Sequence, residues 1–240
     1  PPREMAGAAA DQIRTLAAFG MVPDEPVIHQ SRSLALHERA IARLRVAGLA
    51  YDCGCSRRDL PPSGVYPGTC RNGIPAGRTA RSIRFRIPEV PIALGDRIFG
   101  TSLHRLDEVC GDFVIRRADG LVAYQLAVVV DDIDAGISEI VRGSDLLDSS
   151  PRQQALYAAL EAPAPAWMHL PLIVDRKGAK LSKSTRADPV TGQVPVRALT
   201  LALAALGHPP PSGLRSLDSL WDWARAHWEP ARIPREPFEL

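Results

Sequence analysis

The sequence predicts an α/β fold in which a parallel sheet packs against helices and is interrupted by a cysteine-containing insertion. Strand-like and helix-like segments alternate from SEIVRG (138–143) through SSPRQQALYAALEA (149–162) to MHLPLIV (168–174). Such alternation is typical of parallel sheets. Residues 51–80 lack a sustained hydrophobic period and are rich in Gly, Pro, Arg and Cys, and the segment after 195 is helical. These three observations define the expected architecture.

The first fifty residues predict a helix, a short extended piece and a second helix. Apolar residues recur at helical spacing over 7–19, and Gly20 follows as a C-terminal cap. PVIHQ (26–30) is expected to be a short extended strand between the two helices. A helix is then expected over 34–46, beginning after Ser31 or Ser33 as the cap and ending near Gly48.

The middle of the chain predicts a β-rich insertion followed by α/β segments. SIRFRI (82–87) alternates as a strand, and Asp119-Gly120 within 112–124 indicates a hairpin turn. Periodicity alone does not decide whether the apolar run LAVVVDDI (126–133) is a helix or a strand. Residues 138–143 are expected to form a strand, 149–162 a helix with Ser149 or Ser150 as its cap and Pro151 in its first turn, and 168–174 a buried strand.

The last part of the chain predicts a basic loop and two helices. Residues 178–186 are polar and basic, 196–206 form a helix that ends at Gly207, and 208–213 are a linker. The last helix places several apolar side chains at helical spacing, which indicates core packing more often than a ligand site. They are Leu217, Leu220, Trp221, Ala224 and Trp228.

Composition indicates an ordinary globular protein that works in a reducing compartment. The 240 residues are 45% hydrophobic, which suffices for a core, and the net charge of +2 permits a polyanionic partner without demanding one. No apolar run is long enough to cross a bilayer, and residues 1–14 lack the basic and apolar regions of a signal peptide. We therefore expect a cytoplasmic protein with no membrane partner.

Three of the four cysteines, Cys53, Cys55 and Cys70, lie close together in the sequence. This pattern favours a metal site over disulfide bonds, but a closed zinc site needs four ligands. Residue chemistry leaves the fourth ligand open, with three nearby candidates: His104, Asp59 and Cys110. We expect Cys110 to be a core thiol. The six histidines show no helical metal-binding pair, so none is assigned a catalytic role.

The loop GAKLSKS (178–184) follows a predicted buried strand and carries Lys180 and Lys183. Loops at the carboxyl ends of parallel strands are where α/β folds bind ligands. Two lysines there could neutralise phosphate charge that develops during group transfer. The alternative interpretation is a solvated basic loop.

Four segments in this order carry a family resemblance: AYQLAVVVDD (123–132), EIVRGSDLL (139–147), PRQ (151–153) and KLSKS (180–184). Together they resemble the glutamyl branch of the class I aminoacyl-tRNA synthetases, and most closely its short glutamyl-Q members. The likeness runs from PPRE at the start to the C-terminal helices. It implies a Rossmann-type sheet, activation of L-glutamate by ATP with Mg, and transfer of the glutamyl group to the queuosine base at the wobble position of tRNA-Asp. It also implies a monomer.

The resemblance assigns roles to four residues of the reaction site. Tyr124 and Arg142 are expected to contact L-glutamate, which suits a guanidinium that can hold a carboxylate through two parallel hydrogen bonds. KLSKS is similar to the family's KMSKS loop, so Lys180 and Lys183 are expected to stabilise the departing phosphates. Lys183 is the safer ATP ligand of the two.

The resemblance also supplies the fourth metal ligand. The family's zinc motif, C-x-C followed by Y-x-x-x-C, falls on Cys53, Cys55, Tyr66 and Cys70. Tyrosine is an unusual zinc ligand, and general chemistry ranks histidine or aspartate above it. We expect one structural zinc ion. Nearby Arg57, Arg58 and Arg71 could contact phosphate, although solvated surface arginines are the commoner interpretation.

These expectations divide the chain into four parts. Residues 1–50 form the remainder of the first Rossmann half, 51–112 the zinc-binding, acceptor-type insertion, 113–175 the second half, and 176–240 the KLSKS loop with the C-terminal helical region. No H-x-G-H-like segment lies among the 240 residues. In the family that segment precedes PPRE, so we expect adenylate formation by these residues alone to be weak or nil, as ATP–pyrophosphate exchange would show.

Two alternative functions remain at this stage. One is a truncated glutamyl-tRNA synthetase, although only about a quarter of the chain follows KLSKS, which fits the short branch. The other is a noncatalytic, zinc-stabilised remnant that binds tRNA. Glutamate- and ATP-independent tRNA binding would favour the second alternative.

Overall fold

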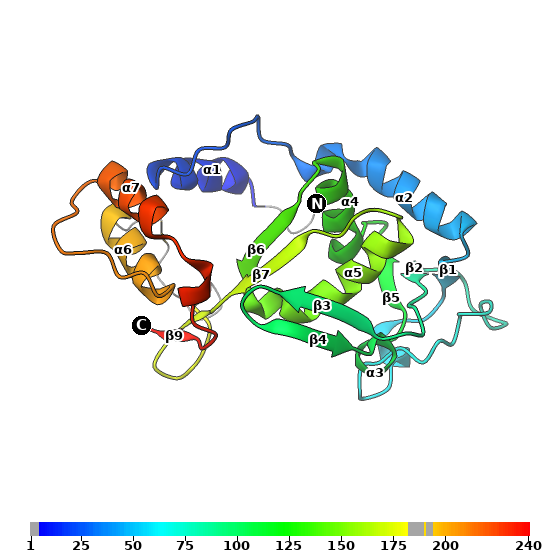
Figure 1. Ribbon diagram of the computed structural model, residues 1–240. Helices are drawn as coiled ribbons and strands as arrows, with labels where there is room; N and C mark the ends of the chain where they lie inside the picture. The colour runs from blue at the N-terminus through cyan, green and yellow to red at the C-terminus, as the bar shows by residue number, and fades with distance from the viewer. Residues whose placement is uncertain (1–4, 182–189, 191–193) are drawn as a thin grey trace. The chain divides into compact units, whose positions relative to one another are not determined.

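The computed structural model describes residues 5–181, 190 and 194–240 (Figure 1). The chain forms two compact units. The central unit comprises Ile28–Met168, and the second unit joins Pro1–Val27 to His169–Leu240. None of the helices in the described part of the chain has the length and hydrophobicity that crossing a bilayer requires.

The central unit contains most of the strands. They are β1 (Ala50–Cys53), β2 (Ser82–Phe85), β3 (Ile92–Asp96), β4 (Gly100–His104), β5 (Phe113–Arg116), β6 (Glu139–Gly143) and β7 (Ala166–Leu170). Its helices are α2 (Leu34–Val46), α3 (Leu106–Val109), α4 (Tyr124–Asp134) and α5 (Ser150–Ala159). Short 3₁₀ turns, η1 (Gln30–Arg32), η2 (Arg57–Asp59) and η3 (Ser144–Ser149), complete it. The strands predicted at 82–87 and 138–143 and the helices predicted at 34–46 and 149–162 are therefore confirmed.

Two sheets form from these strands (Figure 1). The first is antiparallel in the order β1-β2-β5, and its register shifts between Ile83 and Arg84. The second has the order β4-β3-β7-β6. Its β3–β7 pair is parallel, whereas β3 and β4 form an antiparallel hairpin. The sheet is therefore mixed.

The main core lies between helices α2, α4 and α5 and the strands beside them. It contains Leu44, Phe85, Leu126, Leu156 and Trp167, each at most 3% exposed. Burial of side chains of this size stabilises the fold by roughly 1.5–3 kcal/mol each. The run 126–133 is helical because its buried residues recur at helical spacing and place one face of α4 on this core.

Two expectations for the strands are corrected. Residues 26–29 form no strand in the described structure, and η1 follows them, so His29 is extended without a ladder partner. The predicted strand 168–174 is divided into β7 and β8 (Ile173–Val174). Pro171 lies between them, and a proline has no backbone N–H to donate to a ladder.

The expected serine caps of α2 and α5 are confirmed by position only. Ser33 and Ser149 occupy the N-cap positions, but neither side chain accepts a capping hydrogen bond. Pro151 lies in the first turn of α5, as predicted. Ser149 instead accepts a hydrogen bond from Gln125 at 3.1 Å. Its hydroxyl therefore links α5 to α4 rather than closing the helix end.

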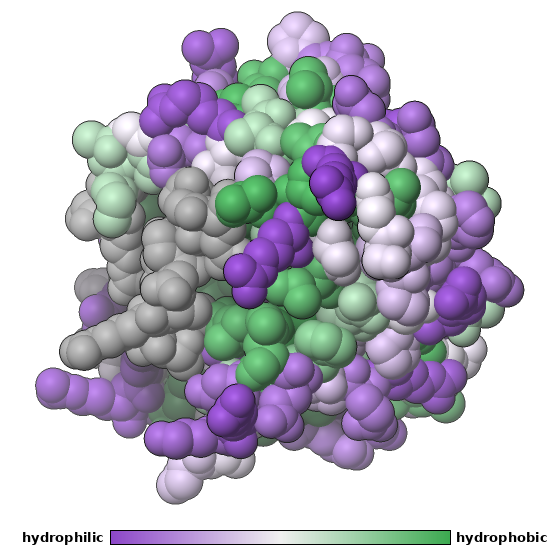
Figure 2. Space-filling view, turned by 90° about the vertical axis from the view of Figure 1, so that its left-hand side faces the viewer, coloured by the Kyte–Doolittle hydropathy of each residue, from purple (hydrophilic) through white to green (hydrophobic). Residues whose placement is uncertain are grey.

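The second unit is mainly helical. Its elements are α1 (Ala8–Ala18), β8, α6 (Pro195–Ala205), α7 (Leu217–His227), η6 (Pro230–Arg232) and β9 (Phe238–Glu239). The helices predicted for 7–19 and 196–206 are confirmed, with Gly20 and Gly207 at φ 76° just beyond them. Leu199, Leu203, Leu220 and Ala224 form the core between α6 and α7. Figure 2 shows hydrophobic side chains among hydrophilic ones on one face of the molecule.

Gly111 packs closely against the backbone of Tyr66, and this contact leads to a testable prediction. Its φ is +63°, and an added Cβ would lie 2.2 Å from the carbonyl oxygen of Tyr66. Gly111→Ala is expected to lower the free energy of unfolding by more than about 3 kcal/mol, because left-handed strain costs about 1–2 kcal/mol and the backbone must also move. Urea denaturation measures the change.

Gly120→Ala is the matched control for this prediction. Gly120 has φ +82°, but among the described residues beyond its two chain neighbours no atom lies within 4 Å of an added Cβ. Its substitution therefore carries the conformational cost alone, about 1–2 kcal/mol. Equal losses for the two variants would show that contact with Tyr66 does not constrain Gly111.

Candidate functional site

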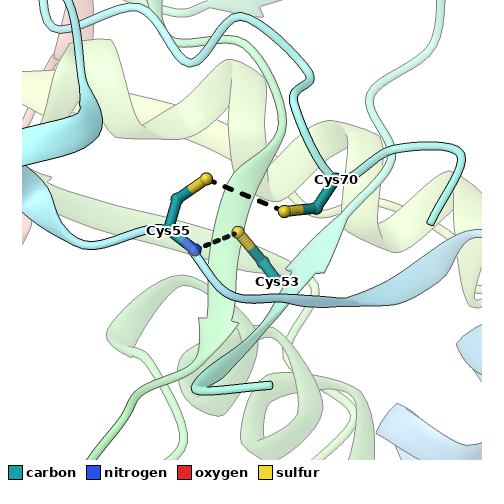
Figure 3. Close-up of side chains that lie close together, drawn as sticks. All are labelled: Cys53, Cys55 and Cys70. Atoms are coloured by element: carbon teal, nitrogen blue, oxygen red, sulfur yellow. Dashed lines mark hydrogen bonds between the residues drawn. The ribbon is translucent and has the colours of Figure 1, made fainter. Parts of the chain in front are cut away.

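Three cysteines from β1 and the loops after it converge in the central unit (Figure 3). Cys53 ends β1, Cys55 follows two residues later, and Cys70 comes from the loop beyond η2. Their sulfur atoms all lie within 4.8 Å of one another, and Cys55 Sγ and Cys70 Sγ are 3.7 Å apart. All three are buried and none forms a disulfide. The sequence prediction of a three-cysteine cluster that could hold a metal ion is confirmed.

Tyr66 lies with its hydroxyl against this cluster. Its Oη is 3.4 Å from Cys53 Sγ and 3.9 Å from Cys55 Sγ, and it accepts a hydrogen bond from the Cys70 amide at 2.8 Å. The side chain is 4% exposed. The phenol therefore completes a group of one oxygen and three sulfur atoms.

The other candidates for a fourth ligand are Asp59, His104 and Cys110. The structure does not group them with the three thiols among the residues it describes. Asp59 accepts hydrogen bonds from Ser56 and from Arg78. His104 Nε2 is 2.7 Å from Ser102 Oγ on the same strand.

Two arginines reach the sulfur atoms, and the sequence interpretation did not single them out. Arg84 Nε donates to Cys53 Sγ at 3.3 Å, and Arg78 donates to Cys55 Sγ at 3.3 Å. The Arg84 guanidinium also lies 3.7 Å above the centre of the Tyr66 ring. Arg84 is only 7% exposed, so its positive charge is held inside the protein beside the thiols. The alternation of SIRFRI predicts that Arg84 and Ser82 lie on the same side of a strand, but it does not show that this side faces the cysteines.

Asp112 fixes the framework around the cluster. Its carboxylate accepts hydrogen bonds from the Ile87 amide at 3.0 Å and from the Tyr51 hydroxyl, and it lies 3.4 Å from Arg71 Nε. Its carbonyl oxygen accepts from Arg84 at 2.6 Å. Asp112 is 3% exposed, so this buried carboxylate joins β1, the end of β2 and the cysteine loop.

The surroundings change the acidity of the cluster. Burial raises the pKa of the Cys53 thiol, but hydrogen bonds from Tyr66, the Cys55 amide and Arg84 outweigh burial and lower that pKa to about 7. Burial and the hydrogen bond with Cys70 raise the pKa of Cys55. Burial and the hydrogen bond with Cys53 also raise the pKa of Tyr66. One thiol is thus prepared to ionise, while the phenol keeps its proton without a cation.

Arg142 forms a second candidate site on β6 of the central unit. One terminal nitrogen, Nη2, donates to Ser150 Oγ at 2.7 Å, and the guanidinium lies 5.1 Å from the centre of the Trp167 ring. Burial lowers the pKa of Arg142, while the negative charge of Asp132 and the hydrogen bond with Tyr124 oppose that shift. The guanidinium is therefore partly desolvated and held in place before any substrate arrives.

Tyr124 begins α4 and shares a side-chain hydrogen bond with Arg142. The structure therefore brings together the two residues expected at the glutamate site. Tyr124 is 49% exposed, so the pair is open to a small molecule. Asp132 accepts a hydrogen bond from Tyr157 at 3.2 Å, and burial raises the pKa of this carboxyl. The sequence interpretation did not select Asp132 or Tyr157.

Lys180, the first residue of KLSKS, belongs to the second unit. Lys180 forms an isolated antiparallel bridge with Val174 after a turn in which Asp175 accepts hydrogen bonds from the Lys177 and Ala179 amides. Lys183 lies outside the described residues. The assignments of Lys180 and Lys183 to phosphate binding stay predictions.

Comparison with known proteins identifies the family. The catalytic domain of the class I (E and Q) tRNA synthetases matches residues 69–197. The chain belongs to this family. A Chromobacterium violaceum protein named glutamyl-Q tRNA(Asp) synthetase is 48% identical, with all of this chain and 83% of that protein aligned. An Aromatoleum aromaticum protein of the same name is 46% identical, over 98% of this chain and 77% of that one.

Solved structures confirm the class I synthetase fold. The Elizabethkingia meningosepticum glutamate tRNA ligase, crystallised in complex with its amino acid, has a TM-score of 0.79 and 21% sequence identity. The similarity covers 99% of this chain but only 58% of that protein. The glutamate-tRNA synthetase of Elizabethkingia anophelis matches with a TM-score of 0.78, over 59% of its length. At this identity the likeness establishes the fold alone.

Proposed function

We propose that this protein activates L-glutamate with ATP and transfers the glutamyl group to the queuosine base of tRNA-Asp. The observation that carries this proposal is 44–48% identity, over nearly the whole chain, to proteins named glutamyl-Q tRNA(Asp) synthetase. The hydrogen bond between Tyr124 and Arg142 supports the proposal, because it brings a phenol and a guanidinium suited to an acidic amino acid together. A cytoplasmic monomer that uses ATP with Mg completes the proposal.

Arg142 and Tyr124 are proposed to hold the glutamate substrate. The Arg142 guanidinium can donate two parallel hydrogen bonds to a carboxylate. Ser150 and the Trp167 ring restrict its orientation, so little side-chain freedom is lost on binding. The Tyr124 hydroxyl is available to orient the same substrate. Lys180 and Lys183 are proposed to stabilise negative charge on the departing pyrophosphate.

Cys53, Cys55, Cys70 and Tyr66 are proposed to bind one structural zinc ion. Tetrahedral zinc with Zn–S bonds of about 2.3 Å and a Zn–O bond of about 2.0 Å separates two sulfur ligands by about 3.8 Å, and sulfur from oxygen by about 3.5 Å. The corresponding distances here are 3.7 Å for Cys55 to Cys70, and 3.4 and 3.9 Å from the Tyr66 hydroxyl to its two nearest sulfur atoms. These three separations are close to those of a tetrahedral zinc site, and the three sulfur atoms all lie within 4.8 Å of one another.

The charge around the cluster supports the same ligand set. Three thiolates and a phenolate around a divalent ion carry excess negative charge, which is costly to bury unless it is paired. Arg84 and Arg78 donate to two of the sulfur atoms and offset that charge. The ion would hold together a segment in which these four residues are the buried members of the local hydrophobic cluster, among the residues that the structure describes.

Charging assays test the proposed function. The full-length gene product is incubated with ATP, radiolabelled L-glutamate and tRNA-Asp that either carries or lacks queuosine. We expect label on the queuosine-containing tRNA only, and attachment that does not depend on the tRNA 3′ end. Label on tRNA-Glu instead would show an ordinary glutamyl-tRNA synthetase. Binding of tRNA without any glutamate transfer would show a noncatalytic module.

A further inference from the structure

An open groove of about 610 Å³ lies beside the cysteine cluster in the central unit. Four arginines contribute to its lining: Arg57, Arg81, Arg84 and Arg117. We call it the arginine groove. Asp119 is the one acidic residue that lines it among those the structure describes. The arginines outnumber the acidic side chain in this lining, although the whole chain has a net charge of only +2.

The arginines of the groove differ in how far they are already engaged. Arg84 donates hydrogen bonds to Cys53 Sγ and to the Asp112 carbonyl oxygen. Arg117 forms an ion pair with Asp119 at 2.5 Å. Arg57 and Arg81 are exposed, and within the described residues neither forms an ion pair with a carboxylate. These two guanidinium groups are available to an external anion.

The cysteine cluster positions both available arginines. The Arg81 amide donates to the Cys53 carbonyl oxygen at 2.9 Å. Arg57 begins η2, whose capping box joins Ser56 to Asp59, and Asp59 pairs with Arg78, which also donates to Cys55 Sγ. Hydrogen bonds to the cysteine cluster and its neighbours therefore fix the backbone of both arginines. The positive charges of the groove have defined positions as a result.

A guanidinium is suited to phosphate because its planar set of donors matches two phosphate oxygens. An open groove with charge along it fits an extended strand rather than an enclosed small molecule. The Ser56 and Ser82 side chains in the lining add hydroxyl groups that can bind phosphate oxygens. We propose that the arginine groove binds the sugar-phosphate backbone of the tRNA substrate, an inference that rests on the proposed function. The sequence suggested both Arg57 and Arg71 as possible phosphate contacts. Arg57 lines the groove, whereas Arg71 forms an ion pair with Asp112.

The double variant Arg57→Ala/Arg81→Ala tests the groove. We expect its affinity for tRNA-Asp to fall at least about tenfold at 0.1 M salt. We also expect the slope of log K against log salt to become shallower by about 1.5, since each phosphate contact contributes about 0.7–0.9. Filter binding over a salt series measures both quantities. Glutamate-dependent ATP–pyrophosphate exchange by the full-length protein is expected to stay at the wild-type rate.

Arg32→Ala/Arg39→Ala is the matched control. Both residues are exposed, belong to the same unit and form no ion pair with a described carboxylate, so the change in net charge is identical. An equal loss of affinity in the two double variants would overturn the groove as a specific site. Unchanged tRNA affinity in the groove variant would also overturn it. Far-UV circular dichroism and the thermal midpoint confirm that each variant is folded.

Two further results separate this inference from the proposed function. In the first, the double variant shows the expected loss of tRNA affinity and the shallower salt slope, but the wild-type protein transfers no glutamate. This result would support the groove and refute the proposed activity. In the second, poly-glutamate and a short RNA hairpin compete with tRNA for the protein. Equal displacement of tRNA by the two competitors would refute the groove as a phosphate site. Arg57→Lys/Arg81→Lys is expected to recover part of the affinity, because lysine keeps the charge but lacks the planar donor set.

Discussion

Arg142→Ala is expected to reduce kcat/KM for L-glutamate at least about 100-fold in ATP–pyrophosphate exchange. A hydrogen bond to a charged group contributes about 1.5–3 kcal/mol, and the guanidinium can donate two to one carboxylate. Loss of about 3 kcal/mol or more corresponds to a factor above 100. The partly buried setting strengthens the effect because less water competes for the carboxylate. Steady-state kinetics of the full-length protein over a glutamate series measures the change.

Two control variants separate recognition from general charge. Arg142→Lys keeps a cation but loses the planar donor set, so most of the defect is expected to remain. Arg97→Ala removes an exposed arginine that pairs with Glu139, at the start of β6, and is expected to leave glutamate kinetics unchanged. A wild-type KM for glutamate in Arg142→Ala would exclude Arg142 from the substrate site.

Local periodicity was sufficient to predict most elements of the fold. Leu34–Val46 and Glu139–Gly143 appear at the predicted places because their hydrophobic spacing matches one face of a helix or a strand. The prediction of a strand at 26–30 was wrong, because an extended segment becomes a strand only when the tertiary structure supplies a pairing partner. The form of 126–133 was decided by packing of α4 on the core, which a short apolar run does not encode.

The candidate site was predictable to a smaller extent. Cysteine spacing indicated the metal cluster, whereas Tyr66 was suggested only by family resemblance. Arg84 escaped the sequence interpretation because its place depends on long-range pairing. The β1–β2 register sets Tyr51 opposite Arg84 and Cys53 opposite Ser82, which brings the guanidinium to the Cys53 sulfur. Asp112 was missed for the same reason, since its partners come from distant segments.

Cys55→Ser is expected to weaken zinc binding more than about 100-fold and to lower the stability of the protein. Removal of an outer-shell partner already costs a metal site about 10–100-fold in affinity, and this change removes a ligand atom. A hundredfold loss corresponds to about 2.7 kcal/mol of stabilisation when zinc is in excess. That loss lowers the thermal midpoint by about 5–10 °C in a chain of this size. Metal analysis and thermal unfolding with and without a chelator measure both effects.

Cys110→Ser is the matched control, because Cys110 is the one cysteine outside the cluster. It is expected to keep a full complement of zinc and its sensitivity to chelators. Equal zinc loss in the two variants would contradict the ligand assignment.

Tyr66→Phe then tests the least expected ligand with the smallest change in shape. The variant keeps the ring beneath Arg84 but removes the hydroxyl that lies against Cys53 and Cys55. If the phenolate binds zinc, affinity falls and a water molecule or buffer anion takes the fourth position, since zinc keeps four ligands. The removed phenolate also leaves the guanidinium of Arg84 with less negative charge to offset. Zinc affinity equal to that of the wild type would instead show a three-cysteine site in which Tyr66 only packs against the thiolates.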